Sequence, residues 1–82
     1  MIEITVAGAN IIIDPEAGTL RPKTYRDASR LGVGYLPENA TEAEQWRIRR
    51  AAVVDTARKI AGRPKYGWTW LDADYGAPIY FL

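Results

Sequence analysis

The stretch TEAEQWRIRRAAVVDTARKIAG, residues 41 to 62, determines the architecture that the rest of this 82-residue chain must fit. Thr41 and Glu44 have the spacing of a capping box, in which each side chain satisfies a free backbone amide at a helix start. Gly62 stands where a C-terminal cap belongs, and the proline two residues later prevents the helix from continuing. The pattern therefore predicts one long helix over residues 42 to 61.

The apolar residues of this helix recur at helical spacing and define the face that we expect to pack on a sheet. At 100° per residue they form one stripe: Trp46, Val53, Val54, Ala57, Ile60 and Ala61. Arg50 falls inside this stripe, where an unpaired guanidinium would be strongly unfavourable. Either its stem packs while the charged end reaches past the sheet edge, or a carboxylate meets it, or the stripe is rotated. We expect a structural role for Arg50 rather than a functional one.

The start of the chain predicts a β-hairpin. In MIEITV apolar residues occupy every second position, which is typical of a half-buried strand, and NIII follows as the returning strand. A type II′ turn at Gly8-Ala9, with Gly8 at positive φ, would join them. This turn sets Val6 opposite Ile11 and Ile4 opposite Ile13, so that one face of the hairpin is aliphatic.

DPEAG, residues 14 to 18, predicts a second turn. Asp14 can accept hydrogen bonds from the backbone ahead of it, and Gly18 can adopt the left-handed conformation that closes a bulged hairpin. A third strand is then expected at residues 19 to 21, ended by Pro22. The first third of the chain is thus predicted to be a three-stranded meander.

Residues 23 to 40 carry the weakest pattern. TYRDASRLG is compatible with two helical turns from Tyr25 to Leu31, stopped by the glycine, and the rest of the segment is expected to be a loop. The loop residues expected to close the edge of the core are Val33, Tyr35 and Leu36.

The last seventeen residues, YGWTWLDADYGAPIYFL, hold six of the nine aromatic side chains. They predict a hairpin of two strands, residues 68 to 71 and 79 to 82. With residue 70 opposite residue 79, one face consists of Trp68, Trp70, Ile79 and Phe81, which we assign to the core below the helix. The fold predicted for residues 1 to 82 is a single small α+β domain. An antiparallel sheet, made of the N-terminal meander and the C-terminal hairpin, packs on one main helix in the order βββ, short α or loop, α, ββ.

The opposite face of the C-terminal hairpin is unusually apolar for a surface exposed to solvent. A contiguous apolar patch usually marks a contact, and a hairpin at the chain end can leave an open sheet edge for a partner strand or a second copy. The residues predicted to contact a partner here are Tyr66, Leu71, Tyr80 and Leu82. The alternative is that residues 25 to 36 fold over this patch.

Charge is distributed unevenly along the chain. Residues 47 to 65 carry seven basic side chains and one acidic one, whereas the remainder carries four basic and nine acidic ones. Arg47 and Arg58 project from one flank of the helix, and Arg63 and Lys65 extend the charge past its end. This basic flank would suit a phosphate backbone or an acidic protein partner.

The composition excludes several kinds of chemistry. The chain has no cysteine and no histidine, so it lacks disulfides, thiolate or imidazole metal ligands and the commonest general base. Asp72 and Asp74 have the spacing of a shared cation site, but turn-forming carboxylates explain them better. We therefore expect no catalytic residue, no metal and no cofactor. An enzyme would need a pocket around this acid pair.

These observations favour a small, non-catalytic binding protein that occupies a surface on a larger protein or protein–nucleic-acid complex. Compact, cysteine-free chains without motifs are a form that phage-encoded inhibitors take, including anti-CRISPR proteins. By this analogy of type alone, the specific expectation is inhibition of a host defence complex that handles nucleic acid. The alternative is direct DNA or RNA binding through the basic flank and the C-terminal aromatics. A homodimer would be the other use of the open edge.

The sequence has neither a signal-peptide pattern nor a run of about 20 apolar residues that could cross a bilayer. We therefore expect no membrane partner and a cytoplasmic location, which would be the host cytosol for a phage-encoded chain.

Overall fold

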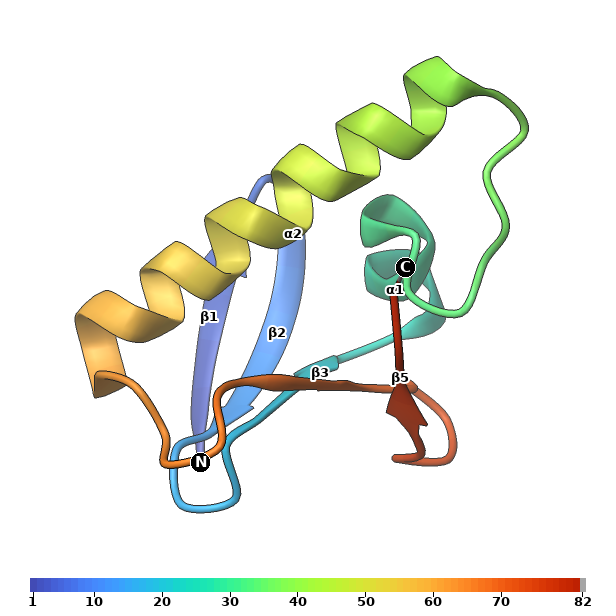
Figure 1. Cartoon of the computed structure of the whole chain (residues 1–82). Helices are drawn as coiled ribbons and strands as arrows, with labels where there is room; N and C mark the ends of the chain where they lie inside the picture. Colours follow the sequence, from blue (N-terminus) through green and yellow to red (C-terminus); the bar gives the residue numbers. More distant parts are fainter. Residues whose placement is uncertain (82) are drawn as a thin grey trace.

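The computed structural model describes residues 1 to 81. The elements follow in the order β1 (Ile2–Val6), β2 (Ala9–Asp14), β3 (Thr19–Pro22), α1 (Tyr25–Leu31), α2 (Ala40–Ala61), β4 (Thr69–Leu71) and β5 (Pro78–Ile79). The α+β class and the predicted order of elements are confirmed. In Figure 1 the long helix α2 runs obliquely across β1 and β2, and the short helix α1 lies beside it.

The sheet is mixed, whereas the sequence analysis predicted an antiparallel one. Its five strands lie in sequence order, and β3 pairs with β4 in parallel through Thr19 with Thr69 and Leu20 with Trp70. The two helices explain this, because a parallel pair needs a long crossover connection. They carry the chain from the end of β3 back to its start, where the Thr69 amide donates to the Gly18 carbonyl at 2.9 Å. The strand that follows must then run in the same direction as β3.

One row of apolar residues crosses the whole sheet and forms the floor of the core. Its members pair in register from β1 to β5: Ile2, Ile13, Leu20, Trp70 and Ile79. Ile13 and Leu20 are fully buried, and Trp70 is only 8% exposed. Leu31 of α1 and Val53 of α2 belong to the same buried cluster, so both helices close this face of the sheet.

The register of the first hairpin differs from the prediction by two residues. Val6 does not face Ile11, nor does Ile4 face Ile13: Ile4 pairs with Ile11 instead. The reason is the turn, which is formed by Ala7–Gly8 rather than Gly8–Ala9 and has positive φ values of 53° and 77° at its two residues. Positive φ at both positions is the geometry of a type I′ turn rather than type II′. A shift of two residues keeps every side chain on its face, so the predicted aliphatic face is correct although its partners are not.

The second turn follows its predicted chemistry. An Asp14 carboxylate oxygen accepts a hydrogen bond from the Ala17 amide at 3.1 Å, and the Asp14 carbonyl accepts one from the Gly18 amide at 2.8 Å. Gly18 has a φ of 72°, in the left-handed region. The strand that follows is β3, which ends at the proline as expected.

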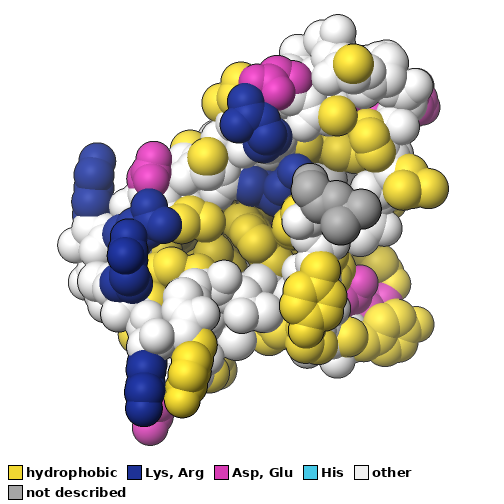
Figure 2. All heavy atoms as spheres, viewed as in Figure 1, with side chains coloured by type: hydrophobic (Ala, Val, Ile, Leu, Met, Phe, Trp, Pro, Cys, Tyr) yellow, Lys and Arg dark blue, Asp and Glu magenta, His cyan; other side chains and the backbone are white. Residues whose placement is uncertain are grey.

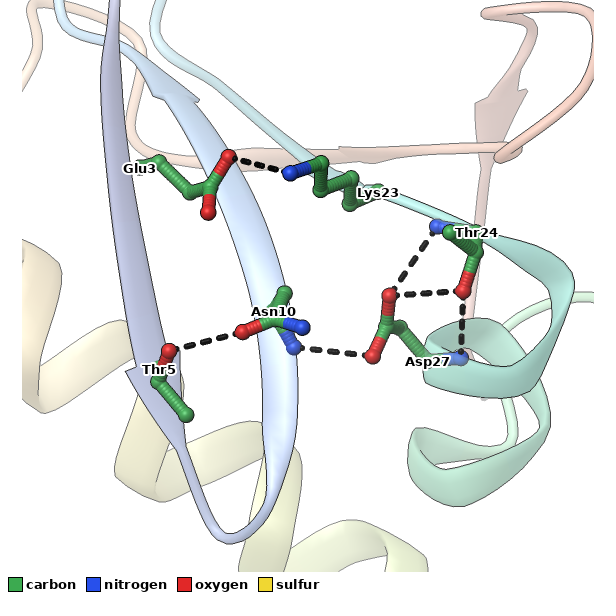
Figure 3. A network of polar contacts seen from close by, with 6 residues as sticks. All are labelled: Glu3, Thr5, Asn10, Lys23, Thr24 and Asp27. Carbon is green, nitrogen blue, oxygen red and sulfur yellow. Dashed lines mark hydrogen bonds and ion pairs between the residues drawn. The ribbon is translucent and has the colours of Figure 1, made fainter.

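Helix α1 spans the predicted residues but begins with a motif that the sequence analysis missed. Thr24 and Asp27 form a capping box, and one Asp27 oxygen also accepts the Asn10 amide of β2 at 2.9 Å. Figure 3 shows this buried carboxylate joining the start of α1 to the sheet. Burial by itself would raise the pKa of Asp27, but hydrogen bonds from the Asn10 and Thr24 amides and the Thr24 hydroxyl outweigh it. The pKa of Asp27 is therefore lowered.

Helix α2 begins two residues earlier than predicted and uses a different cap. Asn39 is the N-cap, and its side-chain oxygen accepts the Glu42 amide at 2.9 Å. The predicted capping box of Thr41 and Glu44 is wrong because asparagine, an equally good cap, occurs first along the chain. The predicted end is confirmed: the Gly62 amide donates to a carbonyl of the last turn at 2.8 Å.

The apolar stripe of α2 is only partly buried. Val53 and Ala57 are buried, and Trp46, Val54 and Ala61 are half-buried. Ile60, predicted to be in the stripe, is 49% exposed. At 1.5 Å per residue a helix of this length spans roughly 33 Å, and the longest dimension of the molecule is 34 Å. Both ends of α2 therefore extend past the sheet, and the last turns lie beyond β1 (Figure 1).

The loop after α1 leaves the core sooner than predicted. Val33 is buried as expected, and its amide donates to the Ala28 carbonyl at 2.9 Å. Tyr35 is exposed and Leu36 is 92% exposed, so the prediction that they close the core edge is wrong. Gly34, with a φ of 81°, turns the chain outward between the buried Val33 and the exposed Tyr35.

The C-terminal hairpin has the predicted pairing of Trp70 with Ile79, but its strands are shorter than predicted. Trp70 is buried and Trp68 is half-buried, whereas Phe81, which we assigned to the core, is 40% exposed. Phe81 follows the last paired residue and therefore has no strand to hold it over the core. The aromatic ending is thus mainly surface, since its three tyrosines are also exposed: Tyr66, Tyr75 and Tyr80.

Neither helix is both long enough and apolar enough to cross a membrane, within the part of the chain that the structure describes.

Candidate functional site

The predicted basic flank loses part of its charge to neighbouring acids on α2. Arg47 forms an ion pair with Glu44, in which Nε donates to Oε2 at 3.0 Å. The hydrogen bond between them raises the pKa of Arg47 and lowers that of Glu44. Arg58 lies 3.7 Å from the carboxylate of Asp55, the pairing that its spacing predicts. These arginines are therefore weaker candidates for binding an external anion than their sequence positions indicate.

The other two residues of the basic flank lie beyond the end of α2. Arg63 and Lys65 are both exposed, and the Lys65 ammonium lies 5.4 Å from the ring centroid of Tyr66. A cation beside an exposed aromatic ring can contact both the phosphate and the base of an unpaired nucleotide. The flank thus divides into a partly neutralised section on the helix and a small charged section after it.

The predicted hairpin face is only partly exposed. Tyr80 is 84% exposed, whereas Leu71 is half-buried. Leu82 lies outside the described residues. β5 is an edge strand as predicted, but it is two residues long and begins with Pro78. Short edges with proline are poor templates for another strand, so β5 offers little to a partner that adds a strand.

The sequence analysis missed a groove between the loop after α1 and the C-terminal segment. Residues 32 to 37 form one wall and residues 79 to 81 the other, around a volume of about 420 Å³. We call this the apolar groove, and its exposed walls are Tyr35, Leu36, Tyr80 and Phe81. Figure 2 shows hydrophobic side chains gathered on this side of the molecule. The loop therefore runs beside the hairpin and forms a wall, instead of covering the patch as the alternative supposed.

A second concave site, which was also not predicted, contains three arginines. It lies between α1, the first half of α2 and the turn at Gly8, and has a volume of about 510 Å³. We call it the arginine cleft, and it is lined by Arg26, Ser29, Arg30, Glu42, Trp46 and Arg49. The distribution of charge along the sequence does not predict this cleft, because two of its arginines belong to the part of the chain that is acidic overall. Only the packing of α1 against α2 brings them beside the third.

Two consecutive arginines of α2 complete the C-terminal end of α1. Arg49 donates to the Arg30 carbonyl at 2.9 Å, and Arg50 donates to the Leu31 carbonyl at 2.7 Å. The last carbonyls of a helix have no partner within it, so these bonds satisfy groups that would otherwise be free. Arg50 therefore has the structural role that we expected, although a backbone carbonyl meets it rather than a carboxylate.

Asp72 and Asp74, the acid pair, lie in a turn that the Asp72 side chain stabilises. A carboxylate oxygen of Asp72 accepts the amides of Asp74 and Tyr75 at 2.7 Å and 3.3 Å. Among residues 1 to 81, no three acidic, histidine or cysteine side chains gather closely enough to hold a metal ion.

Comparison of the chain with protein-family models, curated proteins and solved structures gave no match.

Proposed function

We propose that this chain is a non-catalytic binding protein that docks on a larger partner protein through the apolar groove. The observation that supports this most strongly is the exposure of Leu36 and Tyr80 on opposite walls of one concave site. Large apolar side chains gathered around a groove usually mark a contact, and aromatic residues are enriched among the anchors of interfaces.

The partner that best suits this groove presents an apolar side chain next to a carboxylate. The walls are apolar, and the Arg50 guanidinium lies 4.0 Å from the ring centroid of Phe81 in one of them. Arg50 has five N–H donors and uses one on a backbone carbonyl, so it can also bind an acid group of the partner. Basic side chains along α2 would attract such an acidic surface from a distance.

A host complex that handles nucleic acid is the first partner to test. Only the analogy of type with phage-encoded inhibitors such as anti-CRISPR proteins suggests it, and under this proposal the chain acts in the host cytosol.

The test has two stages. Proteins captured from lysate are identified, purified and then titrated with the wild type and with Leu36→Asp and Tyr80→Asp. Both side chains are exposed, so these variants should fold. We expect each change to weaken binding by roughly tenfold or more, because a carboxylate would be buried against apolar groups. Tyr75→Asp is the matched control, since Tyr75 is equally exposed and does not line the groove.

A purified partner that binds the groove variants as tightly as the wild type would refute the proposal. Loss of self-association in light scattering, with no other protein captured, would show instead that the groove receives a second copy of the chain.

Direct binding of DNA or RNA is the second candidate, and the placement of Lys65 over Tyr66 favours it. Affinity for oligonucleotides should then fall steeply with salt. It should fall further in Arg63→Glu/Lys65→Glu than in Arg47→Glu/Arg58→Glu, because the latter two arginines already have acidic partners. No binding at low salt would exclude this candidate.

A further inference from the structure

We propose that the arginine cleft binds a phosphate group. This site shares no lining residue with the apolar groove, so the inference does not rest on the proposed function. Three guanidinium groups from two helices border one cleft, and a guanidinium fork matches the geometry of phosphate oxygens.

Two of these arginines are already held in place. Arg30 donates through Nε to the Ala7 carbonyl at 2.6 Å, and Arg49 donates through Nη1 to the Arg30 carbonyl at 2.9 Å. Each of these bonds uses one of five N–H donors, which leaves the others for a ligand. Because the side chains are already oriented, binding would cost little of their rotamer entropy.

Gly8 makes room for this arrangement. A Cβ added at Gly8 would lie 2.6 Å from the Nε of Arg30, so any side chain there would displace the guanidinium from its present position. The turn therefore lets the Arg30 side chain cross the backbone and reach the Ala7 carbonyl. In this position Arg30 is one of the residues that line the cleft.

The charges of the cleft favour a dianion. Among the described residues, Arg26, Arg30 and Arg49 form no ion pair, and the single carboxylate at the cleft is that of Glu42. One oxygen of Glu42 accepts the Glu38 amide at 2.9 Å, so the carboxylate is held at the start of α2. Three cations and one anion leave an excess of two positive charges. A phosphate monoester at neutral pH carries nearly that charge, whereas one carboxylate would satisfy a single guanidinium fork.

The phosphate can belong to a free nucleotide or to a nucleic-acid strand. The half-buried Trp46 lines the cleft and supplies an aromatic surface beside the arginines. A volume of about 510 Å³ lies within the range of sites that hold small molecules. A nucleotide presents a phosphate monoester, whereas a strand presents phosphodiesters with one charge each, so two neighbouring phosphates of a strand would be needed to match the excess charge of the cleft. Both sources bind guanidinium groups through phosphate oxygens, and the experiment separates them.

The test is a titration of the full chain, followed by NMR at the Trp46 indole and the arginine Nε groups. Inorganic phosphate, AMP, an eight-nucleotide thymidine oligomer and succinate are added separately at one low ionic strength. We expect phosphate and AMP to bind and succinate to bind more weakly. The double variant Arg26→Gln/Arg49→Gln should weaken phosphate binding roughly tenfold or more, because two charge-assisted contacts are lost.

Arg63→Gln is the matched control, since it removes an exposed positive charge outside the cleft and should leave the affinity within about twofold. The single variant Arg26→Gln guards against misfolding, because the Arg26 side chain forms no hydrogen bond with another residue among residues 1 to 81. Tighter binding of AMP than of phosphate would identify a nucleotide site, and tighter binding of the oligomer than of AMP would identify a strand. Both results support the phosphate assignment.

Three results would overturn it: no perturbation at the cleft by phosphate or AMP, equal affinity of the wild type and the double variant, or succinate binding as tightly as phosphate. Leu36→Asp should leave phosphate binding unchanged, because Leu36 does not line the cleft. A failure of the groove proposal would therefore not count against the phosphate site.

Discussion

The guanidinium of Arg50 lies over the ring of Phe81, 4.0 Å from its centroid. The same side chain donates to the Leu31 carbonyl at the end of α1. One arginine of α2 thus holds both the end of the short helix and the C-terminal segment. Burial lowers the pKa of Arg50, but guanidinium groups titrate so far above neutral pH that the charge is retained.

Replacing Arg50 should destabilise the fold. Arg50→Gln removes the cation over the ring and lengthens or breaks the bond to Leu31, and we expect a loss of about 1–2 kcal/mol in the free energy of unfolding. Urea denaturation followed by tryptophan fluorescence measures it. Arg47→Gln is the control: it removes an exposed arginine that, among residues 1 to 81, pairs only within the helix, so it should destabilise the fold clearly less than Arg50→Gln does. Equal effects of the two changes would contradict the assignment.

Gly32 should tolerate no side chain. Its φ of 71° strains any other residue, and a Cβ there would overlap the indole of Trp46. We expect Gly32→Ala to cost about 3 kcal/mol or more, the sum of backbone strain and overpacking. Gly76→Ala is a matched control, because Gly76 also has a positive φ of 62° but nothing lies within 4 Å of the added atom. It should cost only about 1–2 kcal/mol, the strain alone. A difference near zero between their thermal or urea midpoints would show that Trp46 moves aside.

Local patterns were sufficient to predict most elements of this fold. The turn at Asp14, both helices and the pairing of Trp70 with Ile79 each depend on residues close together in sequence. The parallel pair of β3 and β4 was not predicted, because it depends on where two helices return the chain. The capping box of Thr24 and Asp27 has the Ser/Thr-x-x-Asp/Glu spacing of this motif, so it could have been predicted from the sequence.

The candidate site was less predictable than the fold. Arg47 and Arg58 share a flank of α2, as their spacing indicates, but the sequence analysis did not weigh Glu44 as a partner for Arg47. Leu36 was assigned to the core because it is apolar, although the turn at Gly34 directs it outward. The arginine cleft combines residues of α1 and α2 that are far apart in the sequence, so no local sequence pattern predicts that they lie together.

Asp27 should make the free energy of unfolding depend on pH. Its pKa is lowered in the folded chain, so its contribution is fully present above the ordinary aspartate value of about 3.9 and disappears as the pH falls through the folded value. We expect Asp27→Asn to cost about 2 kcal/mol at pH 7, because both the cap and the bond to Asn10 weaken. The difference from wild type should shrink below that aspartate value, as the wild-type carboxylate is protonated too.

Urea midpoints measured from pH 7 to below the ordinary aspartate pKa of about 3.9 test the dependence on Asp27. Asp55→Asn is the control, since Asp55 is exposed and its ion pair with Arg58, at 3.7 Å, lies on the helix surface. A gap between Asp27→Asn and wild type that stays constant with pH would exclude the carboxylate as the source.

Trp68 should be replaceable by phenylalanine at little cost. Its indole Nε1 is buried and, among the described residues, has no hydrogen-bond partner, which costs about 1–3 kcal/mol relative to a satisfied donor. Trp68→Phe removes that unsatisfied donor together with some apolar area. The two effects oppose each other, and the net change should stay within about 1 kcal/mol. Trp70→Phe loses the same atoms from a position that is only 8% exposed, without removing an unsatisfied donor, so it should be the more destabilising of the two. Urea denaturation of both variants measures the contrast, and a larger loss from Trp68→Phe would mean that its N–H is satisfied in solution.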